Sequence, residues 1–320
     1  MRVLISGGFG FVGGRLAQHL HQAGHQVVLG SRTASSPPEW LPEAEVVKMD
    51  WNDCDALTAV CAGGDVIIHA AGMNAQDSVA NPAEALAFNG VATARLIDAG
   101  SKARVKRFIY LSTAHVYGSP LEGTITEETC PRNLHPYATS HLAGESAVQY
   151  ATQRKQIEGI VLRLSNVFGA PAHAEANCWM LLVNDLCRQA VETGQMVLQT
   201  SGKQPRDFIP MKSVCKIFRN LTTRDDAWNI NSAINVGAGY AMSVISMAEL
   251  IQQRCLLVMG SKPHIHRPES SETGAAPHFE FSTTKLAELL TAPSSDMESE
   301  IDGLLRFCLR SFAPKSTSTV

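Results

Sequence analysis

The sequence lacks the marks of several protein classes. It has no uncharged apolar run approaching 18 residues, so no transmembrane helix and no membrane partner are expected. Its eight cysteines include no Cys-x-x-Cys pair, which favours reduced thiols over a disulfide framework or a zinc site. Too little charge precedes the first apolar stretch for a secretion signal. These absences predict a cytoplasmic protein, and no histidine spacing suggests a metal site.

Charge is also scarce. Charged residues make up 18% of the chain, and the net charge of −3 provides no basic field to attract nucleic acid. Any polyanion that binds must therefore be held by local positive groups. With 320 residues, 45% of them hydrophobic, the chain can bury a large core. This length predicts one large domain or two unequal ones.

The strongest pattern lies in the first thirteen residues, where a short apolar strand runs into a glycine turn. An amphipathic helix follows the turn. Glycine permits positive φ and close approach of the backbone to a pyrophosphate, and the helix N-terminus offers free N–H groups to phosphates. The pattern predicts a phosphate-binding turn made by Gly7, Gly10, Phe11, Val12 and Gly13. The alternative is a glycine-rich loop without a ligand.

Apolar runs rich in β-formers alternate with helical patterns, which is typical of a parallel sheet with crossover helices. The alternation becomes less regular after residue 166. The predicted strands are Arg2–Ser6, Gln26–Gly30, Glu45–Lys48, Val66–His69, Arg107–Ser112, Gly159–Leu164 and Ala233–Val236. The predicted helices are Gly10–Ala23, Ala83–Lys102, Tyr137–Arg154, Asn177–Thr193 and Ser246–Val258, and Ser261–Pro277 is predicted to be a loop.

Several short motifs follow one another in a fixed order. They are Asp50-Trp51, His69-Ala70-Ala71-Gly72, Tyr110-Leu-Ser-Thr-Ala-His-Val-Tyr117-Gly118, Pro136-Tyr137, Arg163-Leu-Ser-Asn-Val-Phe-Gly169, Arg206-Asp207-Phe208-Ile209, Asn235-Val-Gly-Ala-Gly239 and Arg267-Pro268. Each motif alone is unspecific. Together with the glycine turn they make nearly the whole chain resemble the extended short-chain dehydrogenase/reductases, the group of sugar-nucleotide epimerases and dehydratases.

The resemblance implies an α/β fold, a Rossmann-type doubly wound parallel sheet with a smaller C-terminal part. Residues 1–166 would bind NAD or NADP, completed by strands near 207–239, and residues 167–320 would mainly bind a nucleotide-sugar. A homodimer is implied through the helices Ala83–Lys102 and Tyr137–Arg154. The implied cofactor residues are Gly7, Gly10, Phe11, Val12, Gly13, Ser31, Arg32, Asp50, Trp51, Ala70, Ala71, Gly72, Tyr137, His141 and Leu164.

The resemblance also assigns catalytic and substrate roles. Thr113 would hydrogen-bond the reacting hydroxyl or ketone, and Tyr137 would exchange a proton with it. Asn166, Arg206 and Arg267 would hold the substrate's diphosphate or nucleotide, for which cationic side chains are apt. For each arginine a surface ion pair is the alternative.

The cofactor preference depends on the end of the second strand. NAD-binding members usually have an acidic residue there that binds the ribose hydroxyls. This chain has Val28-Leu29-Gly30-Ser31-Arg32, with no carboxylate. Because an arginine can pair with the extra phosphate of NADP, we expect NADP, with NAD as the alternative. In that alternative Arg32 stacks beside the adenine.

The chain departs from the family four residues after Tyr137, where His141 replaces the expected lysine. In the family that lysine holds the nicotinamide ribose and lowers the tyrosine's pKa. At 4–5 Å its charge contributes about 3–4 kcal/mol at an effective dielectric near 20, or roughly two to three pKa units. A histidine with a pKa near 6.5 is only about one-tenth charged at pH 7.5.

Three interpretations of His141 follow. In the first, catalysis persists because the surroundings recruit His141 as a cation or the oxidised nicotinamide's charge helps. In the second, a weakened oxidoreductase reduces a ketone, with protonated Tyr137 as the acid. In the third, the chain binds cofactor or nucleotide-sugar without turnover, as a sensor or structural partner.

The sequence leaves two interpretations for each of two further residues, His115 and Trp51. In dehydratase members Asp-Glu follows the catalytic threonine, whereas Ala114-His115 follow Thr113 here, which argues against 4,6-dehydration. His115 is either a substrate-facing proton donor or a packing residue, and Trp51 lies either by the adenine or in the core.

We expect a 4-epimerase or 4-ketoreductase of a nucleotide-sugar, with action on another small ketone as a variant.

Overall fold

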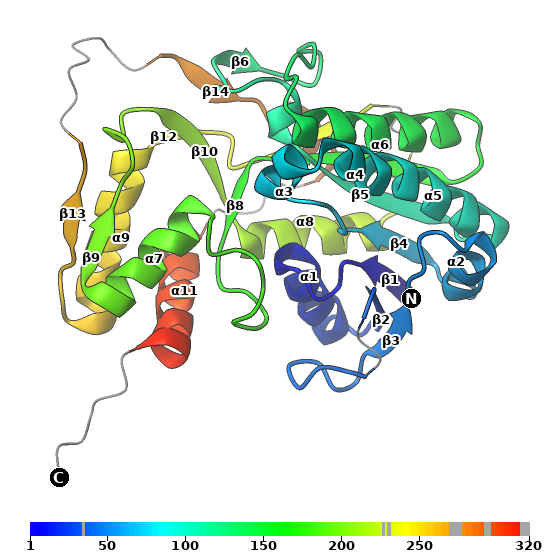
Figure 1. Ribbon diagram of the computed structural model, residues 1–320, viewed down its shortest axis with the longest axis horizontal. Coiled ribbons are helices and arrows are strands. Elements are labelled where there is room, and N and C mark those ends of the chain that lie inside the picture. Colours follow the sequence, from blue (N-terminus) through cyan, green and yellow to red (C-terminus); the bar gives the residue numbers. More distant parts are fainter. Residues whose placement is uncertain (34–35, 226–227, 229–231, 269–276, 291–295, 314–320) are drawn as a thin grey trace.

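The chain is built around a parallel sheet of seven strands, in the order β11–β7–β5–β4–β1–β2–β3. Figure 1 labels five of these strands, β5, β4, β1, β2 and β3. The computed structural model describes residues 1–33, 36–225, 228, 232–268, 277–290 and 296–313. The strands are β1 (Arg2–Ser6), β2 (Gln26–Ser31), β3 (Glu45–Lys48), β4 (Val66–His69), β5 (Arg107–Thr113), β7 (Glu158–Leu164) and β11 (Ile234–Val236). The predicted α/β class and doubly wound parallel sheet are confirmed, with strand bounds that differ by at most one residue from those predicted.

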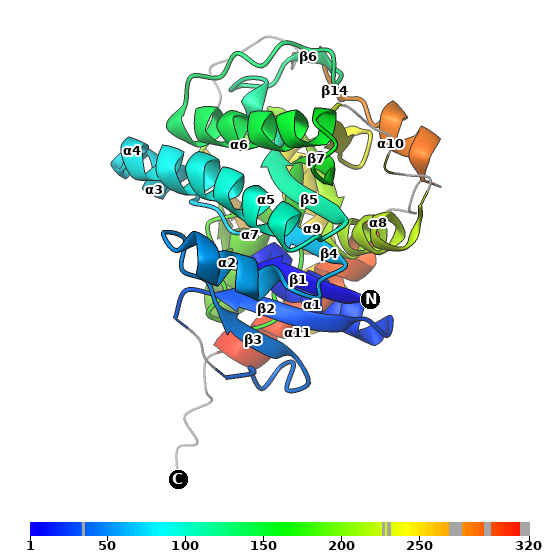
Figure 2. The same ribbon diagram turned by 90° about the vertical axis from the view of Figure 1, so that its right-hand side faces the viewer.

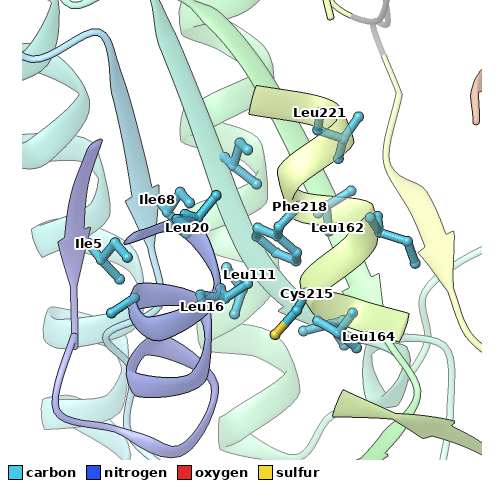
Figure 3. Packing of buried hydrophobic residues seen from close by; sticks show 14 of the residues in the cluster. Ile5, Leu16, Leu20, Ile68, Leu111, Leu162, Leu164, Cys215, Phe218 and Leu221 are labelled. Atoms are coloured by element: carbon cyan, nitrogen blue, oxygen red, sulfur yellow. The ribbon is translucent and has the colours of Figure 1, made fainter. Parts of the chain in front are cut away.

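Helices cover both faces of this sheet, so successive strand residues enter different cores. Val3 and Ile5 pack under α1 (Phe11–Gln22) and α8 (Met211–Thr223), whereas Leu4 packs on the opposite side. Figure 3 shows the first core, where Leu16 and Leu20 of α1 meet strand residues and Phe218 of α8. The second core lies under α2 (Cys54–Cys61), α5 (Ala92–Lys102) and α6 (Pro136–Gln153).

The predicted helix Ala83–Lys102 is divided into three segments. They are α4 (Pro82–Ala85), a π-helical turn η1 (Leu86–Val91) and α5, preceded by the short α3 (Ala75–Ala80). The π turn contains Asn89, whose buried side chain accepts a hydrogen bond from the Met73 N–H (2.8 Å) and donates one to the Ser140 hydroxyl (3.0 Å). Such turns often lie at functional sites, and this one ties the helix to the loop after β4 and to α6.

The C-terminal half contains a separate core. Helices α7 (Leu182–Thr193), α9 (Val244–Met259) and α11 (Met297–Phe312) enclose it, at the left of Figure 1. Two small sheets contribute to it: one of β8 (Asn166–Phe168), β10 (Pro205–Pro210) and β12 (Ala241–Ser243), and one of β9 (Gln195–Val197) and β13 (His264–His266). A third small sheet, of β6 (Gly123–Ile125) and β14 (Phe279–Phe281), packs in a cluster of its own with residues 114–117. A 3₁₀ turn η2 (Ala114–Val116) follows β5, and α10 (Thr284–Leu289) follows β14.

The segment near residue 207 differs from its prediction. In the segment near 207–239, whose strands are expected to complete the central sheet, β11 joins that sheet, whereas β10 pairs with β8 and β12. The buried Asp207 carboxylate explains this placement. It accepts hydrogen bonds from the Ser165 hydroxyl and from the Ala238 and Gly239 N–H groups, which fixes β10 beside the end of β7. The predicted loop Ser261–Pro277 likewise contains β13, and residues 269–276 of it lie outside the described part.

None of the described helices is long and apolar enough to cross a membrane. The eight cysteines are free thiols, and six of them are buried. Within the described ranges no three or more His, Cys, Asp or Glu side chains gather in a way that could hold a metal ion.

Candidate active site

The predicted cofactor residues lie at one edge of the central sheet. The glycine turn follows β1, Arg32 follows β2, the Asp50-Trp51 pair follows β3 and the Ala70–Gly72 segment follows β4. Thr113 and Leu164 are the last residues of β5 and β7. The chain builds β1, β2 and β3 to one side and then crosses to β4 on the other. Ligands of doubly wound sheets bind at such a switch point, beyond the carboxyl ends of the strands.

The glycine turn is shaped to accept an anion. Gly7 has φ +70°, and a Cβ there would lie 2.7 Å from the Ala71 nitrogen. A Cβ on Gly13 would lie 2.2 Å from the Gly7 carbonyl oxygen, so helix α1 packs on the turn backbone. Gly10 is the N-cap of α1 and has no capping side chain, and the first helical turn holds no acidic residue. The N–H groups of Phe11, Val12 and Gly13 therefore point beyond the helix end toward the sheet edge, which fits a dinucleotide pyrophosphate.

Aromatic rings gather at the ends of β2 and β3. The Arg32 guanidinium carbon lies 5.5 Å from the Phe88 ring centroid, and Trp51 packs edge-on against the same ring at 5.4 Å. Trp51 also contacts His69 at 5.7 Å. Its indole N–H is buried and has no hydrogen-bond partner among the described residues. Asp50 accepts a hydrogen bond from the Asn52 N–H (3.0 Å), and Ser31 from the Thr33 N–H (3.2 Å).

Thr113 and Tyr137 meet at the end of β5. Pro136 and Tyr137 begin α6, and the His135 ring caps this helix by accepting the Tyr137 N–H at 3.2 Å. Thr113 is buried, and its hydroxyl lies close enough to the Tyr137 phenol to influence the pKa of that phenol. Burial raises the pKa of the Tyr137 phenol above its ordinary value, and the Thr113 hydroxyl offsets part of that rise. The phenol is therefore protonated near neutral pH.

His141 lies one helical turn beyond Tyr137 and is only 6% exposed. Its ring packs edge-on against the Tyr137 ring with centroids 4.6 Å apart, and its Nδ1 lies 3.0 Å from the Tyr110 hydroxyl. Burial lowers the pKa of His141 to about 4, so the imidazole is neutral at physiological pH. The protein surroundings thus do not recruit it as a cation, which removes that part of the first interpretation. Position 141 adds no positive charge beside Tyr137.

A buried polar network holds α6 on the sheet. Glu145 of α6 accepts hydrogen bonds from the Arg163 guanidinium (Nη2–Oε2 2.6 Å) and from the Ser112 hydroxyl. Arg163 also donates to the Tyr117 hydroxyl (2.9 Å), which donates in turn to the Asn235 side chain (2.7 Å). The network joins β5, α6, β7 and β11 directly beneath Thr113. It fixes the helix that carries Tyr137 and His141 relative to the strand that carries Thr113.

The predicted substrate residues are only partly brought together. His115 lies in η2 beyond Thr113 with an exposed side chain, and partial desolvation, followed by the positive charge of Arg206, lowers its pKa. Asn166 pairs with Phe208 across β8 and β10, and its amide donates to the Asp207 carbonyl (2.8 Å). Arg206 is thus close enough to act on His115 electrostatically.

Arg267 lies elsewhere. It follows β13 and donates to the Ser201 carbonyl oxygen at 3.0 Å. Among the described contacts none joins it to Thr113 or Tyr137. The sequence motif gave no indication of this position. Arg267 follows β13, which pairs with β9 in a small sheet separate from the one that holds Arg206.

Sequence reasoning missed three residues of the site. Tyr110 bonds to His141, the Asn89 carbonyl oxygen contacts Tyr110, and Glu145 bonds to Ser112, the residue before Thr113. One signal was available for Asn89, a polar residue within an otherwise apolar helical stretch. Tyr110 reads as an ordinary strand aromatic, so its hydroxyl contact depends on the fold.

The chain is similar in sequence to known proteins over most of its length. A family model described as "NAD dependent epimerase/dehydratase family" matches residues 3–237. The chain is 32% identical over 265 residues to the dTDP-6-deoxy-L-talose 4-dehydrogenase (NAD(P)(+)) of Kitasatospora kifunensis, covering 78% of each protein. It is 26% identical over 254 residues to a putative UDP-glucose 4-epimerase of Methanocaldococcus jannaschii, covering 78% of this chain and 81% of that protein.

Solved structures share the fold over nearly the full length. A UDP-N-acetylglucosamine 4-epimerase from Methanobrevibacter ruminantium, in complex with UDP-N-acetylmuramic acid, superposes with a TM-score of 0.82 at 23% identity. That match covers 97% of this chain and 98% of the other. The family match spans well over half of the sequence and includes the whole sheet edge described above. The chain therefore belongs to the NAD-dependent epimerase/dehydratase family.

Proposed function

We propose that the chain is an NAD(P)-dependent enzyme that acts on a nucleotide-diphospho-sugar at a secondary alcohol or ketone, most directly as a 4-ketoreductase. The observation that carries this proposal is the placement of Thr113, the last residue of β5, and Tyr137, in the first turn of α6, beside the glycine-turn edge of the sheet. The relative named as a 4-dehydrogenase of a dTDP-sugar supports it. The test is reduction of a nucleotide-4-keto-sugar by the purified chain, with the rate of the parent compared with the rate of Tyr137→Phe.

The chain's own residues would divide the work. When bound, the nicotinamide coenzyme supplies the hydride. Thr113 would donate a hydrogen bond to the ketone oxygen and keep it against Tyr137, and Tyr137 would deliver the phenolic proton to that oxygen. The raised pKa of Tyr137 supports this direction, because a protonated phenol is the form that acts as an acid.

Epimerisation is the second candidate, supported by the likeness to sugar-nucleotide 4-epimerases. It begins with oxidation of an alcohol, for which Tyr137 must first lose its proton to act as a base. A raised pKa makes that step harder, which is why we place reduction first. A chain that binds cofactor or nucleotide-sugar without turnover is the remaining alternative, and the neutral His141 favours it.

His141→Lys tests the missing charge. A lysine ammonium 4–5 Å from the phenol would lower the pKa of Tyr137 by about two units. The phenolate would then form at lower pH, so the rise of kcat/KM with pH in the alcohol-oxidising direction should move down by a similar amount. At pH 7.5 we expect oxidation to be roughly tenfold to 100-fold faster than in the parent. The measurement is a pH–rate profile.

His141→Gln is the control for this variant, because it replaces one neutral side chain by another. Its profile should keep the position of the parent's. An unchanged profile in His141→Lys would contradict the role given to charge at position 141.

The coenzyme residues proposed here lie in residues 1–166, and the substrate would be held mainly by residues 167–320, with Arg206 and Asn166 near the diphosphate. Burial lowers the pKa of the Arg206 guanidinium, which still leaves it positively charged and suited to a phosphate. The side-chain NH₂ of Asn166 donates to the Asp207 carbonyl oxygen, so the side-chain oxygen of Asn166 is the atom that would face the substrate. Arg267 remains in this proposal as a nucleotide contact from the β9–β13 side.

We propose NADP as the preferred coenzyme, although the solved relatives include complexes with NAD. Arg32 follows β2, and residues 28–33 contain no carboxylate. Arg32→Ala should weaken NADP binding about tenfold or more and change NAD binding little, since only NADP carries the extra phosphate. Titration calorimetry with both coenzymes measures this, with the exposed Arg306→Ala as the control. A preference for NAD that persists in Arg32→Ala would contradict it.

We also propose a homodimer through the α4–α5 segment and α6, which lie side by side on one face of the sheet (Figure 2). Apolar side chains stand exposed there, with Leu86 51%, Val91 47% and Tyr150 63% accessible. Burying such side chains against a second copy would stabilise the pair. Light scattering tests this, and a solution mass near the monomer's 34.5 kDa would contradict it.

A further inference from the structure

A buried tyrosine lies behind His141, on the side away from the sheet edge. Tyr110 of β5 is 1% exposed, and its hydroxyl lies 3.0 Å from Nδ1 of His141 and 3.3 Å from the Asn89 carbonyl oxygen. Burial and the Glu145 charge raise the pKa of Tyr110. Its hydroxyl therefore keeps its proton at physiological pH and has one hydrogen to donate.

The geometry selects the acceptor of that hydrogen. The Tyr110 hydroxyl can donate to the Asn89 carbonyl oxygen at 3.3 Å, which also accepts the Thr93 hydroxyl at 2.7 Å, or to Nδ1 of His141 at 3.0 Å. The contact with Nδ1 is the shorter of these two. The neutral imidazole of His141 has one nitrogen that accepts and one that donates. A phenol that donates to Nδ1 makes Nδ1 the acceptor, so the ring's own proton must sit on Nε2.

The Nε2 side of the ring faces the switch-point edge. A Cβ placed on Gly72 would lie 3.7 Å from Cε1 of His141 and 3.8 Å from Nε2. Gly72 belongs to the segment after β4 that lines this edge. Among the described residues Nε2 has no hydrogen-bond partner, whereas Nδ1 has Tyr110.

We propose that Tyr110 is a positioning residue that holds His141 in the Nε2–H tautomer, so that a neutral imidazole offers one N–H donor to a coenzyme ribose hydroxyl. The inference rests on the proposed function in one respect, that a coenzyme occupies this edge. It separates two roles that a lysine would combine. The imidazole keeps the hydrogen bond to the ribose, and no residue at this position supplies the charge that would acidify Tyr137.

The wild-type chain without coenzyme allows a direct test. Nitrogen-15 NMR of ¹⁵N-histidine-labelled protein at pH 7 distinguishes the two neutral tautomers by which ring nitrogen carries the proton. The signals of His141 are identified by their loss in His141→Gln. We expect a protonated Nε2 and an unprotonated Nδ1, persisting on acidification until the pH nears 4. A protonated Nδ1, or an imidazolium at pH 7, would overturn the proposal.

Tyr110→Phe tests the cause of the tautomer. Loss of the phenol donor should raise the Nδ1–H form of His141 from a minor species to about half of the population, and therefore weaken coenzyme binding about twofold. Tyr117→Phe is the matched control, because Tyr117 is also buried and its hydroxyl contacts Arg163 and Asn235 instead. It should leave the His141 tautomer unchanged.

An Nε2–H tautomer that persists undiminished in folded Tyr110→Phe would show that Tyr110 does not set it. If that variant does not fold, the wild-type spectrum still decides the tautomer. The result is independent of turnover. If activity depends on Tyr137 but His141 is protonated on Nδ1, this inference is wrong and the proposed function stands. If His141 is protonated on Nε2 but the chain has no activity, the proposed function is wrong and this inference stands.

Discussion

Tyr137→Phe is expected to lower kcat for reduction of the keto-sugar by about 100-fold or more, with coenzyme affinity nearly unchanged. Proton transfer by a positioned side chain contributes roughly 10²–10⁴ in rate, and Tyr137, which lies beside Thr113 at the end of β5, is the acid in the proposed reaction. The phenyl ring of the variant keeps the edge-on contact with His141. Steady-state kinetics with a nucleotide-4-keto-sugar, together with coenzyme titration, measure the two quantities.

Tyr150→Phe is the control for this variant, because Tyr150 lies on the same helix and is 63% exposed. It should retain the parent rate. A Tyr137→Phe variant as active as the parent would refute both candidate activities. A parent that binds nucleotide-sugar yet turns over neither an alcohol nor a ketone substrate would support the non-catalytic alternative.

Glu145→Ala is expected to lower the free energy of unfolding by about 3–5 kcal/mol. The side chains of Arg163 and Glu145 are 7% and 3% exposed, so the substitution leaves a buried guanidinium without its counter-charge. The Ser112 hydroxyl loses its acceptor as well. Urea denaturation followed by circular dichroism gives the difference. The same variant should lose activity out of proportion to the folded fraction, since the network fixes α6 beneath Thr113.

Glu192→Ala provides the comparison for the second prediction. Glu192 pairs with Arg188 one turn away on α7, and both side chains are about one-third exposed. Such a pair contributes only about 0.3–0.5 kcal/mol. A loss below about 1 kcal/mol in Glu145→Ala would mean that the buried network does not stabilise the fold as proposed.

The central sheet could be predicted because its strands are buried on both faces. In β4, for example, Val66, Ile67 and Ile68 are apolar and buried in succession, which is typical of a strand in a parallel sheet covered on both faces. The helix predicted over Ala83–Lys102 covers the expected residues, but its middle is a π turn and not an α-helix. That turn depends on Asn89 bonding to Met73 and Ser140. Those partners come from elsewhere in the chain.

The C-terminal half was harder to predict for a different reason. Its strands are mostly three residues long, such as β8 and β12, which is too short for an alternating pattern to appear. Helix α7 begins at Leu182 rather than Asn177, and α11 was not predicted. The placement of β10 depends on the buried Asp207, whose partners lie before and after it in the sequence.

The candidate site shows the same division. Residues next to a motif, such as Gly7 and Thr113, could be located from the sequence at the ends of strands. The neutral state of His141 could not, because it follows from burial. Arg267 carried a family motif, yet its described hydrogen bond is to Ser201.

The candidate active site draws on parts of the molecule that have separate cores. Thr113 and Tyr137 belong to elements packed on the large sheet, whereas Arg206 lies on a three-stranded sheet beside the core that α7, α9 and α11 enclose. In the proposed function, substitutions in that C-terminal core would change the side of the site that holds the substrate and leave the Thr113–Tyr137 pair untouched. Substrate choice could then evolve without a change in the proton transfer.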